Sequence, residues 1–295
     1  EDHVWDGVYI DNPENCWMRM CNFQGLAGSA VIVHRGAQQV TVEDCISRQP
    51  VSEIGGLRRR TFLTMGGKCL FLRCYSEEGI NDFSAGYCAP GPNAFVQCDA
   101  VGSHGFSGGS SSWATGLLFD NVNIEGGGIS FKNLELDKWG AGWNTANSTL
   151  YQCSASYIDC YSPAEDAKCY AIGCWSYCHG NGVWKSTNDH VRPYSLYTTQ
   201  LSARLGTDVG VRFRILERGH DGATSPSVAR AAEMAREALL PRITLDQWID
   251  SARLSASVEI KGVKAVDAVK DAKGVKAEEG KYPAITANGT FVLAS

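Results

Sequence analysis

The stretch that decides the fold is TFLTMGGKCLFLRCYSEEGINDFSAGYCAPGPNAFVQCDA, residues 61–100, in which two short apolar runs end in cysteine, LFLRC at Cys74 and AFVQC at Cys98. Similar runs occur before and after it, each closed by a cysteine or an asparagine. The closing residues are Cys21, Cys45, Cys74, Cys98, Asn121, Cys153 and Cys174. Their spacings of 24, 29, 24, 23, 32 and 21 residues indicate a solenoid in which each repeat is one coil.

An apolar column accompanies this ladder, three positions before each closing residue. It consists of Met18, Val42, Phe71, Phe95, Leu118, Leu150 and Ala171. A right-handed parallel β-helix turns its corners at the same place in every coil, with coils about 4.8 Å apart. Cysteine and asparagine suit such a corner because they are small and hydrogen-bond locally. We therefore predict an all-β, right-handed parallel β-helix; a β-sandwich or propeller shares its strand and turn signals and is the alternative.

The chain divides by composition into three parts. Residues 1–222 are predicted to form the β-helix, with strand-like order continuing to about Leu205. Residues 223–254 are predicted to be a helical segment: one helix lies between Pro226 and Pro241, and a second begins at the capping-box pair Thr244 and Gln247. Residues 255–295 read as a linker, or as the start of a further β domain.

Composition and charge exclude some classes of function. The formal net charge is −5 and the isoelectric point is about 5.7, which argues against nucleic acid as a partner. No apolar run is long enough to predict a transmembrane segment. The first residues, EDHVWDGVYIDN, read as the middle of a coil, so we expect other domains of the same longer chain.

The 12 cysteines do not read as a disulfide framework, because six of them are ladder residues that we expect to pack as buried thiols. Cys16, Cys69 and Cys169 each lie five residues before a ladder cysteine, at the opposite end of the same short strand. This separation points the two sulfurs of each pair apart, which argues against zinc. Cys88, Cys160 and Cys178 remain free to pair.

Two acidic residues stand at equal offsets from the ladder: Glu53 is eight residues after Cys45, and Asp82 is eight after Cys74. Each precedes an apolar residue, so we expect the two carboxylates at matched places on adjacent coils. A close pair suits a retaining glycosidase and a wider pair an inverting one. The alternative is that both acids occupy turns and bind backbone amides or nearby arginines.

Arg58, Arg59 and Arg60 follow Glu53 closely and are predicted to assist catalysis or bind substrate. Arginine can clamp a uronate carboxylate in bidentate fashion, or neutralise it so that the adjacent C–H becomes acidic. The alternative is that they form salt bridges with Glu53, Glu77 or Glu78.

Histidines and tryptophans supply further candidates. His104, beside a glycine-rich stretch, is a candidate general acid or base, and His179 is a candidate substrate-binding residue. Indole faces stack on sugar rings, or else cover the sheet. The remaining substrate-binding candidates are Trp113, Asp137, Trp139 and Trp143.

APGPN at residues 89–93 and SWATGLLFDN at residues 112–121 carry a resemblance that extends over about Val4 to Gly206. The sequence resembles the pectate-lyase-like right-handed β-helix proteins of polysaccharide degraders such as Bacteroidetes, and PRITLDQWID resembles the helical segment that often trails their β-helix. Relatives often have His or Arg where Ser110–Ser112 stand, which argues against catalysis by that loop. The resemblance implies a carbohydrate setting more firmly than a particular reaction.

The leading hypothesis is a secreted, periplasmic or cell-surface bacterial enzyme that cleaves a complex or acidic polysaccharide along the β-helix groove. Hydrolysis by Glu53 and Asp82, assisted by His104 or Arg59, is preferred. A polysaccharide lyase comes next, with calcium held by Asp82 and its neighbours as a candidate cofactor. Two non-enzymatic hypotheses stand beside these: a glycan-binding or structural module, and an assembly element that pairs through an open coil end.

Overall fold

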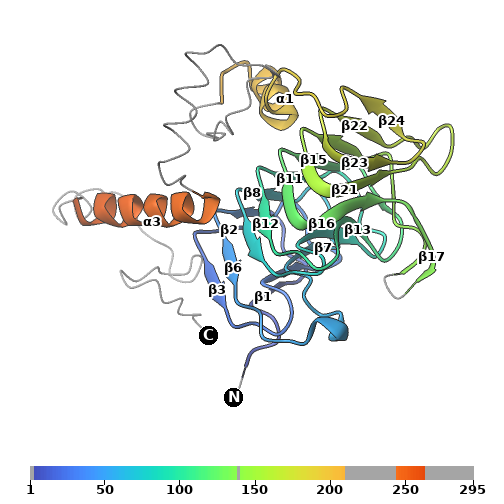
Figure 1. The fold of residues 1–295 in the computed structure, drawn as a ribbon. Helices are drawn as coiled ribbons and strands as arrows, with labels where there is room; N and C mark the ends of the chain where they lie inside the picture. The colour runs from blue at the N-terminus through green and yellow to red at the C-terminus, as the bar shows by residue number, and fades with distance from the viewer. Residues whose placement is uncertain (1–2, 138–139, 210–243, 263–295) are drawn as a thin grey trace, which may run out of the picture. The chain divides into compact units, whose positions relative to one another are not determined.

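The computed structural model describes residues 3–137, 140–209 and 244–262 of the 295-residue chain, with side chains of the last segment described up to residue 254. Short strands stack coil upon coil, and each coil passes through three faces (Figure 1). Successive coils pair in parallel, which a β-sandwich or a propeller would not do. The fold is therefore the all-β parallel β-helix that the sequence predicts.

Each face is one column of strands. The first face contains β1 (Val8–Ile10), β4 (Val31–Val33), β7 (Phe62–Thr64), β10 (Phe83–Gly86) and β13 (Phe106–Ser110). The second contains β2 (Trp17–Arg19), β5 (Thr41–Glu43), β8 (Leu70–Leu72), β11 (Asn93–Val96), β15 (Leu117–Asp120), β20 (Thr149–Tyr151), β22 (Tyr170–Ile172) and β24 (Val183–Lys185). The third contains β3 (Asn22–Gln24), β6 (Ile46–Arg48), β9 (Tyr75–Glu77) and β12 (Asp99–Val101).

Three longer strands run from the third face into the first without a break: β16 (Asn123–Phe131), β21 (Ser154–Cys160) and β23 (Trp175–His179). Loops between the first and second faces hold two small ribbons. These are β14 (Ala114–Thr115) with β19 (Thr145–Ala146), and β17 (Asn133–Asp137) with β18 (Gly140–Trp143). A 3-10 turn, η1 (Ile54–Gly56), interrupts the long loop before β7. Insertions in the loops thus leave the strand columns continuous.

One residue with positive φ makes each corner between the second and third faces. In successive coils these residues are Met20, Asp44, Arg73, Gln97, Asn121, Gln152 and Gly173. The next residue turns inward, and the register places Val122 level with Cys98 and Cys153. The prediction that Asn121 belongs to the ladder is therefore wrong by one residue. Asparagine instead suits the left-handed corner, where its short polar side chain is tolerated.

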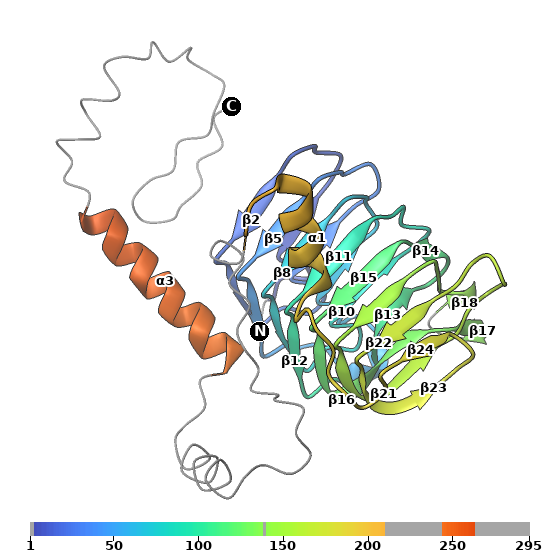
Figure 2. The ribbon, with the colours of Figure 1, turned by 90° about the horizontal axis from the view of Figure 1, so that it is seen from above.

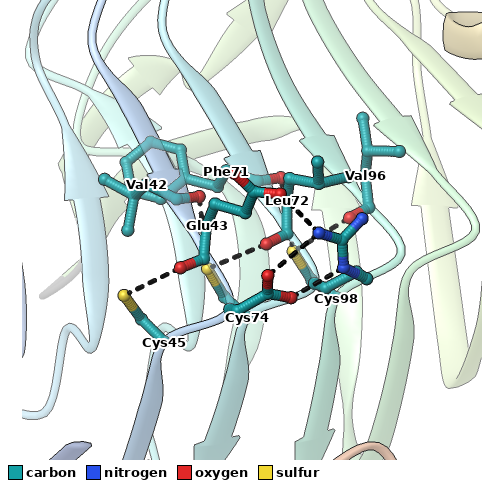
Figure 3. Close-up of polar contacts among 10 residues, drawn as sticks. Val42, Glu43, Cys45, Phe71, Leu72, Cys74, Val96 and Cys98 are labelled. Atoms are coloured by element: carbon teal, nitrogen blue, oxygen red, sulfur yellow. Dashed lines mark hydrogen bonds and ion pairs between the residues drawn. The ribbon is translucent and has the colours of Figure 1, made fainter. Parts of the chain in front are cut away.

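Buried thiols form the ladder itself, and Figure 3 shows the sulfurs of Cys45, Cys74 and Cys98 in a row on successive coils. The thiols of Cys74, Cys98, Cys153 and Cys174 each donate toward carbonyl groups of their own coil and the preceding one. For Cys98, Sγ lies 3.6 Å from the oxygens of both Val96 and Phe71. Burial raises the pKa of Cys74 well above its usual value. All 12 cysteines are free thiols.

Aromatic rings stack inside the second face. The inward column is Met18, Val42, Phe71, Phe95, Phe119, Leu150, Ala171 and Trp184. Leu118, predicted for this column, points outward instead, because Phe119 is the residue level with Phe95. The centroid of the Phe95 ring lies 4.7 Å from that of the Phe71 ring and 4.8 Å from that of the Phe119 ring. This spacing matches the coil repeat: the rings of Phe71 and Phe95 stack with an interplanar angle of 14°, and that of Phe119 is tilted by 32° from Phe95.

The strands end at Lys185, and helix α1 (Leu196–Leu205) follows. The expectation of strand-like order to Leu205 is wrong there, because Ser195 accepts the N–H of Thr198 as an N-cap and Gly206 closes the helix with a φ of 66°. Asp120 of β15 anchors the helix: its carboxylate accepts from Ser195 Oγ and from the N–H of Tyr197, both at 2.7 Å.

Helix α3 (Leu245–Gly262) begins where the sequence predicts, with the N–H of Thr244 donating to Gln247 Oε1 at 3.2 Å. It continues past Ser255, where the sequence predicts a linker. Contacts divide the chain into two compact units, residues 1–249 and 250–295. Within the first unit, Leu245 and Ile249 pack on Ile46 and Tyr75. The helix predicted between Pro226 and Pro241 and the tail after residue 262 lie outside the described residues.

Replacing one stacked ring should cost far more than replacing one ladder thiol. We expect Phe95→Ala to lower the free energy of unfolding by about 3–5 kcal/mol because it leaves a cavity in the stack. We expect Cys98→Val to cost under about 1.5 kcal/mol, since Val122 already fills the same position one coil away. Chemical denaturation of both variants is the measurement, and equal losses would contradict this account of the core.

The buried Asp120 carboxylate should make stability depend on pH. Burial raises its pKa from 3.8 to about 6, so the folded chain holds this proton more tightly than the unfolded chain. The contribution of Asp120 to stability is therefore present at acidic pH and is lost as pH rises from about 4 to about 6. Relative to Asp120→Asn, wild type should lose on the order of 2–3 kcal/mol across that window, measured by denaturation at several pH values. A difference independent of pH would contradict this assignment.

Candidate functional site

The structure places Glu53 and Asp82 at different positions of their coils. Phe83 pairs with Phe62, so Asp82 lies level with Thr61, whereas Glu53 precedes η1 in the long loop before β7. The prediction that the two acids occupy matched places is wrong, because the extra residues of this loop break the spacing counted from the ladder. Glu53 is exposed to solvent and Asp82 is fully buried.

Asp82 serves the corner that contains it. Its Oδ1 accepts hydrogen bonds from Ser76 Oγ at 2.6 Å and from the N–H of Gly79 at 3.1 Å. Burial raises the pKa of Asp82 above its usual value. The described part of the chain contains no group of three His, Cys, Asp or Glu side chains placed to hold a metal, so nothing there marks the calcium site considered for Asp82.

The three consecutive arginines bind different partners. Arg59 is buried and donates from Nε to the carbonyl of Ser52 at 3.0 Å and from Nη1 to the carbonyl of Glu78 at 3.1 Å. It also forms a salt bridge with the Glu78 carboxylate at 3.4 Å. Arg59 therefore ties the long loop to the next coil.

Arg58 and Arg60 lie over aromatic rings. The Arg58 guanidinium is 4.1 Å from the centre of the Trp5 ring, and that of Arg60 is 5.4 Å from the centre of the Tyr87 ring. Burial lowers the pKa of Arg60. Both cations thus pack on aromatic faces, a contact that stabilises positive charge.

The remaining candidates from the sequence are scattered over the coils. His104 is exposed between β12 and β13, and Asp137 is exposed at the end of β17. Trp113 donates its backbone N–H to the carbonyl of Trp143 at 2.8 Å, which brings these two residues side by side. Trp139 lies outside the described residues.

The structure does bring together an acid, a cation and an imidazole on the later coils: Lys132, Asp159 and His179. Asp159 of β21 lies level with His179 of β23 and with Ser130 of β16. Lys132 Nζ is 2.8 Å from Asp159 Oδ2, and His179 Nδ1 is 3.5 Å from Asp159 Oδ1. Ser130 Oγ donates to Asp159 Oδ2 at 2.9 Å. We call Lys132, Asp159 and His179 the charged cluster.

The charged cluster lies on the outer surface of the first face, since its neighbours Phe131 and Ile158 point into the core. The Asp159 side chain is 11% exposed, whereas Lys132 is 34% and His179 41% exposed. The cation and the imidazole can therefore meet a ligand while the carboxylate stays behind them.

Two tyrosines border the charged cluster. Tyr177 is 71% exposed, and its ring meets that of His179 nearly at right angles with centroids 4.5 Å apart. Tyr157 lies one coil before Tyr177 and pairs level with it. Burial raises the pKa of Tyr157. The surface thus offers a phenol beside the imidazole.

This arrangement suits proton transfer. Because Nδ1 of His179 faces Asp159, the other ring nitrogen, Nε2, faces away from the carboxylate. A carboxylate behind a histidine orients the ring and stabilises its protonated form. Lys132 adds a positive charge that can neutralise a bound carboxylate.

The sequence signal for the charged cluster is a pattern in successive coils: Tyr157-Ile-Asp159 and Tyr177-Cys-His179. Sequence reasoning named His179 but missed Lys132 and Asp159, because it counted offsets from the ladder. The pairing of β16 with β21 shifts between Ile124 and Gly128, and that of β21 with β23 between Ser154 and Tyr157, so equal offsets no longer mark equal places.

Comparison with known proteins finds one family. Residues 182–294 match the model of a family described as a domain of unknown function (DUF6298). Neither the curated proteins nor the solved structures contain a match to the chain. The matched residues begin at the last strand of the β-helix and include α1 and α3, whereas the charged cluster precedes them. In the described part of the chain, neither helix has the length and apolar character to span a bilayer.

The two acids predicted as a catalytic pair should differ in their effect on stability. We expect Asp82→Ala to cost about 1–3 kcal/mol, because it leaves Ser76 and Gly79 without their buried acceptor. Glu53→Ala, at an exposed position, should change stability by less than about 0.5 kcal/mol. Denaturant unfolding measures both, and an Asp82→Ala variant as stable as Glu53→Ala would contradict the structural role of Asp82.

Proposed function

We propose that the outer surface of the first face binds a uronate-containing polysaccharide and cleaves it by β-elimination at the charged cluster. The observation that carries this proposal is the contact of Asp159 with both Lys132 and His179 on a partly exposed surface. The sequence resemblance to pectate-lyase-like proteins supports the same substrate class.

Elimination fits the charged cluster better than hydrolysis does. Hydrolysis with retention or inversion uses two carboxyl groups on either side of the scissile bond. Asp82 is fully buried, and Asp159 is the one carboxylate in the charged cluster. Proton abstraction beside a carboxylate needs a base and a cation instead, and His179 with Lys132 supplies both.

In the proposed reaction, Lys132 pairs with the uronate carboxylate, which makes the C5–H more acidic. His179 Nε2 takes that proton, the C–H electrons form a C4–C5 double bond, and the glycosidic bond at C4 breaks. The leaving oxygen takes a proton from the exposed phenol of Tyr177 or from water. Asp159 positions His179 and stabilises the imidazolium that forms.

A non-catalytic glycan-binding module is the second candidate. The last coils expose Trp175 at 43% and Tyr177 at 71%, and Trp175 stacks on His190 with centroids 5.2 Å apart. Exposed aromatic faces of this kind bind sugar rings without any reaction. This candidate retains the ligand class but assigns no role to the proton-transfer geometry.

The test is product formation from plant and algal uronate polysaccharides, followed by ultraviolet absorbance of unsaturated uronate and by reducing ends, with calcium or with a chelator. We expect unsaturated products from wild type and a loss of about 100-fold or more in His179→Gln and Lys132→Gln. Glu53→Gln, exposed and outside the charged cluster, is the matched control and should retain activity.

Three different results would each reject part of this proposal. Reducing ends without unsaturation, abolished in Glu53→Gln, would replace elimination by hydrolysis. Binding of the polysaccharide without products would favour the glycan-binding module. Unsaturated products undiminished in His179→Gln would place the chemistry elsewhere on the molecule.

A further inference from the structure

A groove of about 680 Å³ lies between α1 and the outer surface of the second face. Figure 2 shows α1 alongside β5, β8 and β11. The charged cluster belongs to the first face, so the groove is a separate site. Its volume is within the range of about 300–1,000 Å³ that is typical of small-molecule pockets.

The floor of the groove is a column of outward side chains. Thr41, Leu70, Ala94 and Leu118 pair level with one another across four coils. They alternate with the inward residues Val42, Phe71, Phe95 and Phe119. All four floor residues are only partly buried, which leaves a mainly apolar strip open beneath α1.

One side of α1 forms the wall. Tyr197, Leu201 and Arg204 line the groove, and their spacing of four and three residues places them on the same side of the helix. Ser195 Oγ and the N–H of Tyr197 donate hydrogen bonds to the Asp120 carboxylate, and these bonds hold the first turn of the helix against β15. The wall is therefore fixed to the coil that supplies the floor residue Leu118.

Among the described residues, the charged side chains lining the groove are Lys68 and Arg204, and both are cations. Lys68 comes from the turn before β8 and is exposed, as is Arg204 in the last turn of α1. Within the same part of the chain no Asp or Glu lines the groove, although the whole chain carries a net charge of −5. The groove thus combines an apolar floor with a positive rim.

We propose that the groove binds a small amphipathic carboxylate with an aliphatic body, which lies on Leu70, Ala94 and Leu118 while its head group pairs with Lys68 or Arg204. An aliphatic body suits this floor because transfer of apolar surface from water is favourable. A polysaccharide fits less well, since the four floor residues are aliphatic or hydroxylated and offer no flat aromatic face on which a sugar ring stacks. The proposal is independent of the function assigned to the charged cluster.

Calorimetric titration of the full chain with decanoate tests this site. We expect saturable binding of one decanoate, with affinity weakened about five- to tenfold in Lys68→Gln or in Arg204→Gln, because each removes one charge at the rim. Ala94→Phe, which fills the floor without entering the core, should abolish binding, and so should Thr41→Phe, which fills the floor two coils away. Lys168→Gln is the matched control: it removes an exposed cation that lies outside both the groove and the charged cluster, and it should bind as wild type does.

Several results would overturn the proposal. Decanol binding as tightly as decanoate would mean that the positive rim recognises nothing, and butyrate binding equally well would deny a role to the apolar floor. Decanoate binding that persists in folded Ala94→Phe and Thr41→Phe, checked by circular dichroism, would place the ligand elsewhere. If decanoate does not bind and wild type self-associates while these variants do not, the groove is a contact between copies of this chain instead.

Discussion

Backbone hydrogen bonds between residues at the same place in successive coils hold this molecule together, and they depend on a left-handed residue at one corner. Gln97, with a φ of 51°, donates its N–H to the carbonyl of Asp120 one coil later, and Arg73, with a φ of 48°, donates to Val96. Left-handed backbone is unfavourable for most residues, so it persists only where the surrounding structure requires it. Repeated at every coil, this corner directs the following residue inward, and the thiols of Cys74 and Cys98 and the methyl groups of Val122 occupy equivalent positions as a result.

Parallel register also explains how separate stretches of sequence form sites. Because each strand places alternate side chains outward, one position repeated over several coils becomes a column on the outer side of a face. Ser130, Asp159 and His179 form such a column on the first face, and Leu70, Ala94 and Leu118 form another on the second. The loops lengthen between columns without disturbing them, as the loop before β7 and the β17–β18 ribbon do. The chemistry of a coil is therefore decided by the few residues that point outward from its strands.

The sequence was sufficient for the fold because the ladder and its apolar column repeat with every coil. It was insufficient for the sites, because loops and bulges change the number of residues between equivalent positions. The sequence predicts Asn121 as the ladder residue, whereas the ladder position belongs to the next residue, Val122. Asparagine is common both at corners and in ladders, and only the pairing of Phe95 with Phe119 shows which position Asn121 occupies. Glu53 and Asp82 were matched by counting from the ladder, but pairing of Phe62 with Phe83 separates them. The correct register follows when positions are counted back from the inward aromatic of the next strand, which is Phe62 for Glu53 and Phe83 for Asp82.

Environment, and not residue type, assigns different roles to the carboxylates of the β-helix. Asp82 and Asp120 are buried and accept from backbone N–H groups and hydroxyls, which fix a corner and the start of α1. Burial raises the pKa of both, so each titrates as part of the folded structure. Asp159 differs because its partners, Lys132 and His179, are themselves partly exposed and titratable or charged. A carboxylate that orients groups in contact with solvent can act on a ligand, whereas Asp82 and Asp120, with buried hydrogen-bonded partners, support the fold, and this distinction favours the first face for the proposed chemistry.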